Sequence, residues 1–181
     1  MATAITGIAP ARADGLQQSD FADLVRANQA MVYSIAYHFL NNRDRAEELA
    51  QDVFLQLHKN LHKLRSPEHA VNWLRKVTCH RCIDQARQSK QRTEVGLEQA
   101  PEPAVQPVYD DPFLAEKLRK LVASLPEKKR LLVILRYQEE MEFEEIAKVL
   151  RTPARTLRTQ LCRTLAQLRR KASSMVEENR S

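Results

Sequence analysis

Two cysteines and two histidines are the residues of this sequence whose types and spacing most resemble a chemical site. Cys79 and Cys82 stand three residues apart, with His80 between them, and His58 and His62 lie four apart upstream. Cys2His2 is a common zinc ligand set, which binds at about 2.0 to 2.3 Å. On helices each spacing places its pair on one face. The pattern leaves three interpretations open: a zinc site, a thiol switch, or cysteines that only pack.

The rest of the sequence favours packing. The two cysteines lack the glycine-bearing turn of most zinc knuckles, and three cysteines are too few for a disulfide scaffold. We expect no bound metal and no cofactor, and we expect Cys162 to be a packing residue.

No pattern of residues indicates catalysis. Three glycines are few for phosphate-binding loops, and neither an HExxH motif nor a nucleophile elbow is present. Five glutamates close together are interpreted as a solvated acidic patch near helix starts: Glu139, Glu140, Glu142, Glu144 and Glu145. We therefore expect that the chain is not an enzyme.

Composition predicts an all-α protein with a polyanionic partner. Leu, Ala, Arg, Lys, Glu and Gln, which dominate the 181 residues, favour helices. The net charge of +6 and the pI near 9.4 favour nucleic acid as the partner. No run approaches the roughly 18 apolar residues of a membrane span, and the N-terminus lacks a signal-peptide pattern. We expect a cytoplasmic protein without membrane insertion.

Apolar periodicity and prolines divide the chain into two small helical domains. Three helices are predicted in the first, over about 21–39, 46–61 and 70–88, and four in the second, over about 113–125, 127–138, 143–150 and 154–175. Asp20 is the expected cap of the first helix, and "NNRD" (41–44) the first turn. The expected segments are a disordered tail (1–18), a helical domain (19–92), a flexible Pro-rich linker (93–112), a helix-turn-helix domain (113–175) and a tail (176–181).

The strongest local signal is a helix-turn-helix over 143–171. Thr152 is the expected N-cap of its second helix, with Pro153 at the first helical position. Leu157, Leu161, Leu165 and Leu168 form an apolar stripe on that helix, and no acidic residue occurs between Arg151 and Lys171. A basic face on the second helix suits the major groove of DNA, although a solvated amphipathic hairpin is the alternative.

Three stretches of sequence carry a resemblance to a known family. They read "RAEELAQDVFLQLHKNL", "AVNWLRKVTCHRCIDQAR" and, after the linker, "LVASLPEKKRLLVILRYQEEMEFEEIAKVLRTPARTLRTQLCRTLAQLR". Together they resemble the extracytoplasmic-function (ECF) sigma factors, two-domain specificity subunits of bacterial RNA polymerase. The resemblance implies promoter recognition, help in opening DNA for transcription initiation, and binding to the clamp and flap regions of the polymerase core. It also leaves room for an anti-sigma factor as a partner.

The resemblance implies three sets of binding residues. The first set is expected to bind the polymerase and lies on the second helix: Glu47, Glu48, Gln51, Asp52, Val53, Phe54 and Leu55. Contacts with the minus-ten promoter element fall to Arg65, Asn72, Trp73, Arg75, Lys76, His80, Arg81, Asp84 and Arg87. Contacts with the minus-thirty-five element fall to Arg151, Thr152, Arg155, Thr156, Arg158, Thr159 and Arg163.

Some residues depart from the family pattern. Arg151 stands where glycine is common, which predicts a backbone that avoids the usual left-handed conformation. Cys79 takes a position that is often exposed and basic in the family, and Cys82 a small buried one. Two alternatives to a sigma factor are a stand-alone helix-turn-helix regulator and a metal or thiol sensor that uses Cys79 and Cys82.

Overall fold

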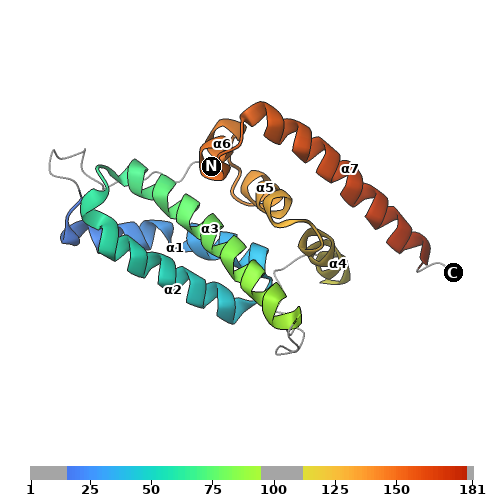
Figure 1. Ribbon diagram of the computed structural model, residues 1–181, viewed down its shortest axis with the longest axis horizontal. Coiled ribbons are helices and arrows are strands. Elements are labelled where there is room, and N and C mark those ends of the chain that lie inside the picture. The colour runs from blue at the N-terminus through green and yellow to red at the C-terminus, as the bar shows by residue number, and fades with distance from the viewer. Residues whose placement is uncertain (1–15, 95–111, 179–181) are drawn as a thin grey trace.

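The computed structural model describes residues 16–94 and 112–178, and every regular element in these ranges is helical (Figure 1). The first domain contains α1 (Gln18–Leu40), α2 (Arg43–Asn60), the 3-10 turn η1 (Leu61–Lys63) and α3 (Pro67–Glu94). The second contains α4 (Pro112–Ala123), α5 (Glu127–Tyr137), α6 (Phe143–Leu150) and α7 (Ala154–Glu178). The all-α class with two helical domains is confirmed. Most of the predicted linker and N-terminal tail lies outside the described residues.

The turn between α1 and α2 forms as the sequence predicts. Asn41 ends α1 in the left-handed conformation (φ 52°), and the Asn42 side chain accepts a hydrogen bond from the Arg45 backbone N–H at 2.9 Å. The predicted cap of α1 is wrong, because Gln17 is the N-cap. Asp20 lies three residues inside, where its carboxylate accepts the Gln17 N–H at 2.8 Å and completes a capping box.

α3 begins three residues earlier than predicted. Pro67 is its first residue, a position where the missing N–H costs no hydrogen bond. The Ser66 hydroxyl accepts the backbone N–H of His69 at 3.2 Å and so caps the helix. Proline therefore starts this helix as well as ending the segment before it.

The turn between α6 and α7 differs from the prediction at two residues. Arg151 has φ 51° and ψ 46°, so it keeps the left-handed conformation that glycine would adopt more easily. Its backbone N–H bonds to the Ala147 carbonyl, which ends α6. Thr152 does not cap α7, because its hydroxyl donates to the Leu150 carbonyl at 3.2 Å, and α7 begins at Ala154 after Pro153. α7 also continues to Glu178, into the predicted tail.

The apolar stripes of both domains join into one continuous core. α1 packs against α2 and α3, and from the second domain α5 packs against both α1 and α3, while α6 contacts α3. Figure 1 shows α5 and α6 beside α3. The core draws on both domains, among others through these fully buried residues: Ile35, Phe39, Leu57, Leu74, Leu131, Leu135 and Ile146.

Arg130 of α5 links helix ends from both domains. Its Nη1 donates to the Phe39 carbonyl, in the last turn of α1, at 3.0 Å, and its guanidinium lies 4.9 Å from the Phe39 ring centroid. Its Nη2 donates to the carbonyls of Ala123 and Leu125 at the end of α4. Carbonyls in a last helical turn lack intrahelical partners, so a cation there satisfies them. Burial lowers the pKa of Arg130.

All three cysteines are free, but two expectations about their positions are wrong. Cys79, which the resemblance placed at an exposed position, is fully buried, as is Cys82. Cys162, expected to pack, is exposed. Burial raises the pKa of the Cys79 thiol to about 12 and raises that of Cys82 as well. Since the thiolate is the reactive form, the buried pair is protected both by its position and by its protonation.

We expect Arg151→Gly to raise the free energy of unfolding by about 0.5 to 1 kcal/mol, because glycine adopts the left-handed conformation without a Cβ clash. Denaturant titration of both proteins measures the change. Arg163→Gly, at an exposed position inside α7, is the control and should lower stability by about 1 kcal/mol. An equal loss in both variants would contradict the left-handed conformation at Arg151.

We expect only one thiol to react rapidly with an aromatic disulfide reagent at pH 8 in the folded protein. Cys162 should react first, because it is exposed, and Cys79 and Cys82 should follow far more slowly or only on unfolding. Mass spectrometry of the labelled peptides identifies the site. Rapid labelling of Cys79 would show that it is accessible in the folded chain.

Candidate nucleic-acid interface

The basic face of α7 points to solvent. Leu157, Leu161 and Thr164 are buried against the rest of the second domain. The exposed side of the helix carries five of the predicted minus-thirty-five residues: Arg155, Thr156, Arg158, Thr159 and Arg163. Arg151 is also exposed, in the preceding turn, and Thr152 is half-buried. Cys162 lies on this same face by helical spacing.

The apolar stripe predicted for the second helix of the helix-turn-helix lies on the opposite side of α7. It is confirmed at Leu157 and Leu161, which are buried, while Leu165 and Leu168 are half-buried.

Arg158 is held by two residues at the start of α6. Its Nη2 donates to Glu144 Oε1 at 2.7 Å, and its guanidinium lies 5.1 Å from the Phe143 ring centroid. The Glu144 backbone N–H and then Arg158 lower the pKa of the Glu144 carboxyl. Both partners are more than half exposed, so the ion pair contributes little to stability. It orients Arg158 while leaving the guanidinium free to exchange its partner.

The five glutamates near α6 are not simply a solvated patch, as the sequence had suggested. Glu139 is half-buried and accepts a hydrogen bond from the Ser34 hydroxyl of α1 at 2.6 Å. Burial raises its pKa, against the opposing effects of Ser34 and Arg75. Glu145 lies 3.6 Å from Arg75 of α3. Glu139 and Glu145 therefore face the first domain, whereas Glu140 is exposed.

Most predicted minus-ten residues share one face of α3. At 100° per residue, Trp73, Lys76, His80, Asp84 and Arg87 fall within one arc of the helix, with Arg81 at its edge. His80, Arg81, Asp84 and Arg87 are exposed there, and Trp73 and Lys76 are half-buried. Arg65 is exposed before the helix. The structure thus gathers these side chains on one surface.

Arg75 is the exception among the predicted minus-ten residues. It lies on the arc of α3 that faces the second domain, where its side chain is only 22 % exposed. α6 also reaches the beginning of α3, where Asn72, Trp73 and Lys76 share a hollow of about 220 Å³ with Lys148 and Val149. Part of the predicted minus-ten surface is thus covered by the helix-turn-helix domain.

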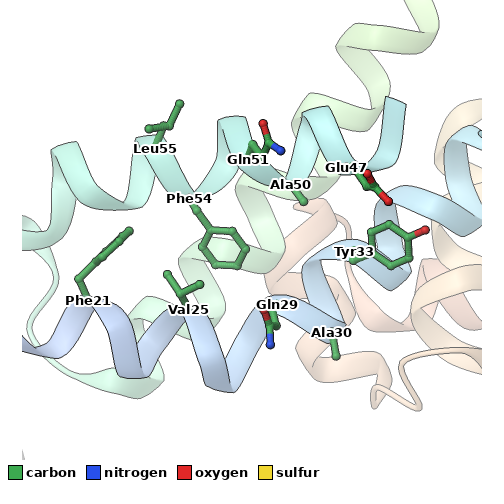
Figure 2. A pocket seen from close by; sticks show the side chains of 10 residues that line it. All are labelled: Phe21, Val25, Gln29, Ala30, Tyr33, Glu47, Ala50, Gln51, Phe54 and Leu55. Carbon is green, nitrogen blue, oxygen red and sulfur yellow. The ribbon is translucent and has the colours of Figure 1, made fainter. Parts of the chain in front are cut away.

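A long apolar groove runs between α1 and α2. Figure 2 shows its walls, with Phe21 and Val25 on α1 facing Phe54 on α2, whereas Leu55 points away from α1 at the edge of the groove. The groove has a volume of about 890 Å³, and Glu47 and Gln51 line it as well. Leu55 is 60 % exposed, which is unusual for a large apolar side chain. Apolar walls beside the exposed carboxylates of Glu47, Glu48 and Asp52 would accommodate a helix that presents apolar and basic residues.

The groove includes four of the seven predicted polymerase-binding residues, namely Glu47, Gln51, Phe54 and Leu55. Val53 is fully buried, so it supports this surface from the core and is not available for contact. The α1 wall was missed: Phe21, Val25, Gln29, Ala30 and Tyr33. A signal for it was present in the sequence, because Phe21 and Val25 are apolar residues of α1 that the domain core buries only partly and that line the groove.

A second apolar hollow, of about 380 Å³, was also missed. It lies between α1 and the second domain, and its walls include His38, Leu118, Val133, Tyr137 and Leu165. Leu118 and Tyr137 are each about half exposed, at 47 % and 54 %. Burial, and then Arg119, lower the pKa of His38, which therefore stays neutral at pH values where an exposed histidine would begin to charge.

The zinc ligands considered from the sequence do not converge. Cys79 and Cys82 are buried, whereas His58 and His62 are exposed, and the ring of His58 packs edge-on against Phe21 at 5.1 Å. Across residues 16–94 and 112–178, no group of three or more His, Cys, Asp or Glu side chains could hold a metal ion. In the same ranges, no helix is long and apolar enough to cross a membrane.

Comparison with known families gives two matches along the chain. Residues 24–93 match the family described as Sigma-70 region 2, and residues 115–168 match Sigma-70, region 4. The first match begins within α1 and runs through most of α3, and the second runs from α4 into α7, the helix with the basic face.

Individual proteins agree with these matches. The chain is 26 % identical to the ECF RNA polymerase sigma factor SigW of Bacillus subtilis, over 84 % of this chain and 89 % of SigW. It is 29 % identical to the ECF RNA polymerase sigma factor SigE of Mycolicibacterium smegmatis, over 91 % of this chain and 66 % of SigE.

Among solved structures, the fold is similar to the sigma factor RpoE in complex with the anti-sigma factor NepR from Bartonella quintana. The TM-score is 0.71 at 16 % identity, over 84 % of this chain and 96 % of that chain. CnrH in complex with the cytosolic domain of CnrY matches at a TM-score of 0.63 and 17 % identity, over 87 % and 90 % of the two chains. With both sigma-70 regions in order along one all-helical chain, this protein belongs to the ECF sigma factors.

Proposed function

We propose that this sigma factor directs RNA polymerase core to promoters through three separate surfaces: the α7 face, the exposed face of α3 and the α1–α2 groove. The observation that carries the proposal is the exposed α7 face, which carries Arg155, Arg158 and Arg163 and no acidic residue, within the part of the chain that matches sigma-70 region 4. Sigma factors select where the polymerase begins and do not themselves catalyse RNA synthesis. We accordingly propose a non-catalytic, cytoplasmic role beside the polymerase.

The α7 face is proposed to read the minus-thirty-five element in the major groove. Arg155, Arg158 and Arg163 supply guanidinium groups that can bind guanine bidentately or pair with phosphates. Thr156 and Thr159 supply short hydroxyl side chains between them, and Arg151 and Thr152 lie before the helix, where phosphate contacts are usual. The absence of acidic residues between Arg151 and Lys171 avoids repulsion along the DNA backbone.

The exposed face of α3 is proposed to bind the minus-ten element and help open it. Lys76, Arg81 and Arg87 can hold phosphates of separated strands, while Trp73 and His80 offer rings on which an unstacked base can stack. Holding unpaired bases requires no catalytic group, since binding energy alone shifts the equilibrium toward the open duplex.

The α1–α2 groove is proposed to take a helical segment of the polymerase clamp. An exposed leucine in an apolar groove with acidic residues along its edge is the pattern of a helix-in-groove interface. The hollow around Leu118 and Tyr137 is a candidate for the flap contact. The two solved relatives are complexes with NepR and with the cytosolic domain of CnrY, which supports proposing an anti-sigma partner here too.

Arg158→Ala should weaken promoter binding by about 1 to 3 kcal/mol and relax sequence preference at one position, because a bidentate contact to a base edge is lost. Run-off transcription by the reconstituted holoenzyme on a randomised promoter library measures both effects. Lys128→Ala, which removes an exposed cation from α5, is the control and should change neither. Equal weakening on every promoter would show that Arg158 contacts phosphate alone.

Leu55→Arg should weaken binding to core polymerase at least about tenfold, because an exposed apolar side chain at the edge of the groove is replaced by a charge. Stability should stay within about 0.5 kcal/mol, since Leu55 is exposed. Ala27→Arg, on an exposed part of α1 outside the groove, is the matched control. Titration of labelled core with each variant gives the dissociation constants, and wild-type affinity in Leu55→Arg would remove the groove from the proposed interface.

A further inference from the structure

The apolar hollow between α1 and the second domain has the size and the walls of a small-molecule site. Its volume of about 380 Å³ lies at the lower end of the roughly 300 to 1,000 Å³ that is usual for such sites. Three helices of the second domain supply its six aliphatic side chains: Leu118 and Val122 of α4, Val133 and Ile134 of α5, and Leu165 and Leu168 of α7. Aliphatic walls favour a ligand with an alkyl body.

The hollow has a buried interior and an exposed rim. Ile134 is buried, whereas Leu118 and Tyr137 are 47 % and 54 % exposed. Large apolar side chains that remain in water lose favourable free energy, which they recover when another apolar group covers them. An alkyl chain that lies in the hollow would cover the rim as well as the interior.

One cation of the hollow has an unused hydrogen-bond donor. Arg119 of α4 lines the hollow, and its Nη1 is buried without a hydrogen-bond partner. A guanidinium nitrogen can only donate, so only an acceptor can satisfy it. A buried donor without an acceptor costs free energy, which a ligand oxygen bound beside it would recover. The polar part of the hollow is therefore incomplete in the free chain.

The charge in the hollow has one sign. The other polar side chains that line it are His38, Tyr137 and Gln138, and none of the described lining residues is acidic. Arg119 acts electrostatically on His38, whose pKa is lowered by burial and then by this arginine, so the two groups lie near each other. A carboxylate oxygen suits this set best, because its charge-assisted hydrogen bond to a guanidinium is stronger than that of a neutral acceptor.

We propose that this hollow binds a small carboxylate with an alkyl body, whose oxygens pair with Arg119 and whose chain packs on the walls from α4, α5 and α7. A neutral alcohol of the same length would make the apolar contacts without the ion pair, and a cationic amphiphile would be repelled by Arg119. The inference does not rest on the flap contact proposed for the rim of this hollow, because the free chain should bind the ligand without polymerase.

The first measurement is calorimetric titration of the free full-length chain with decanoate and with decan-1-ol. Decanoate should bind saturably at a single site with a dissociation constant of about 10 to 100 μM. Decan-1-ol should bind at least about tenfold more weakly, because its hydroxyl oxygen carries no charge to pair with the guanidinium. Equal affinities for the two probes, or no saturable binding of decanoate below about 1 mM, would overturn the proposal.

The second measurement repeats both titrations with Arg119→Met and Arg26→Met. Each variant removes one positive charge and keeps an unbranched apolar stem, but Arg26 is exposed on α1 outside the hollow. Arg119→Met should bind decanoate at least about tenfold more weakly and decan-1-ol within about threefold of wild type, because only the ion pair is lost. Arg26→Met should match wild type. An equal loss in the two variants would show general attraction of an anion to a basic protein and would overturn the site.

A pair of bulky variants distinguishes this hollow from the larger groove between α1 and α2. Val133→Phe fills part of the hollow, and Ala30→Phe fills part of the groove. Val133→Phe should lower decanoate affinity at least about tenfold by occupying the volume of the alkyl chain, while Ala30→Phe should leave it unchanged. Thermal unfolding without ligand shows that each variant folds, and decanoate should raise the melting temperature of Ala30→Phe alone. The opposite pattern would place decanoate in the α1–α2 groove and overturn the proposal.

Discussion

The structure depends on how α3 is covered. Ala70 and Leu74 turn one side of this helix toward the core of its own domain, while Arg75, Cys79 and Cys82 turn a neighbouring side toward α5 and α6. Because α1 and α2 can cover only part of a helix, the second domain completes the burial. What remains in solvent is the arc that carries His80, Asp84 and Arg87. The packing around α3 thus determines which of the predicted minus-ten side chains are exposed to solvent.

Arg130 shows why the second domain fits this side of the first. Its guanidinium bonds to carbonyls at the ends of α1 and α4 and lies over the Phe39 ring. One side chain therefore satisfies helix ends in both domains, which apolar packing alone could not do. The same residue leaves its Nε buried without a partner. The contact is thus specific in geometry, although its hydrogen bonding is not fully satisfied.

Local signals in the sequence predicted most of the fold, and contacts between distant residues account for most of what was missed. The α6 and α7 helices began where expected, because proline and the apolar stripe are local features. The roles of Asp20 and Thr152 were wrong because several residues near a helix end can cap it, and geometry selects one. Burial of Cys79 and the pairing of Glu145 with Arg75 depend on contacts between residues some seventy positions apart. The spacing of apolar residues along one helix gives no information about such contacts. The family resemblance implied polymerase-binding residues on α2, but neither the groove nor its α1 wall was predicted, because the groove forms only where two helices meet.

The acidic residues around α6 differ in what they hold in place. Glu144 pairs with Arg158 of α7 at 2.7 Å, and Glu142 pairs with Arg136 of α5 at 3.1 Å, so these two carboxylates join helices within the second domain. Glu139 accepts a hydrogen bond from Ser34, and Glu145 lies 3.6 Å from Arg75, so these two act across the contact between the domains. The pair at Arg158 orients one arginine of the basic α7 face, and because both partners are more than half exposed, the pair costs little to exchange.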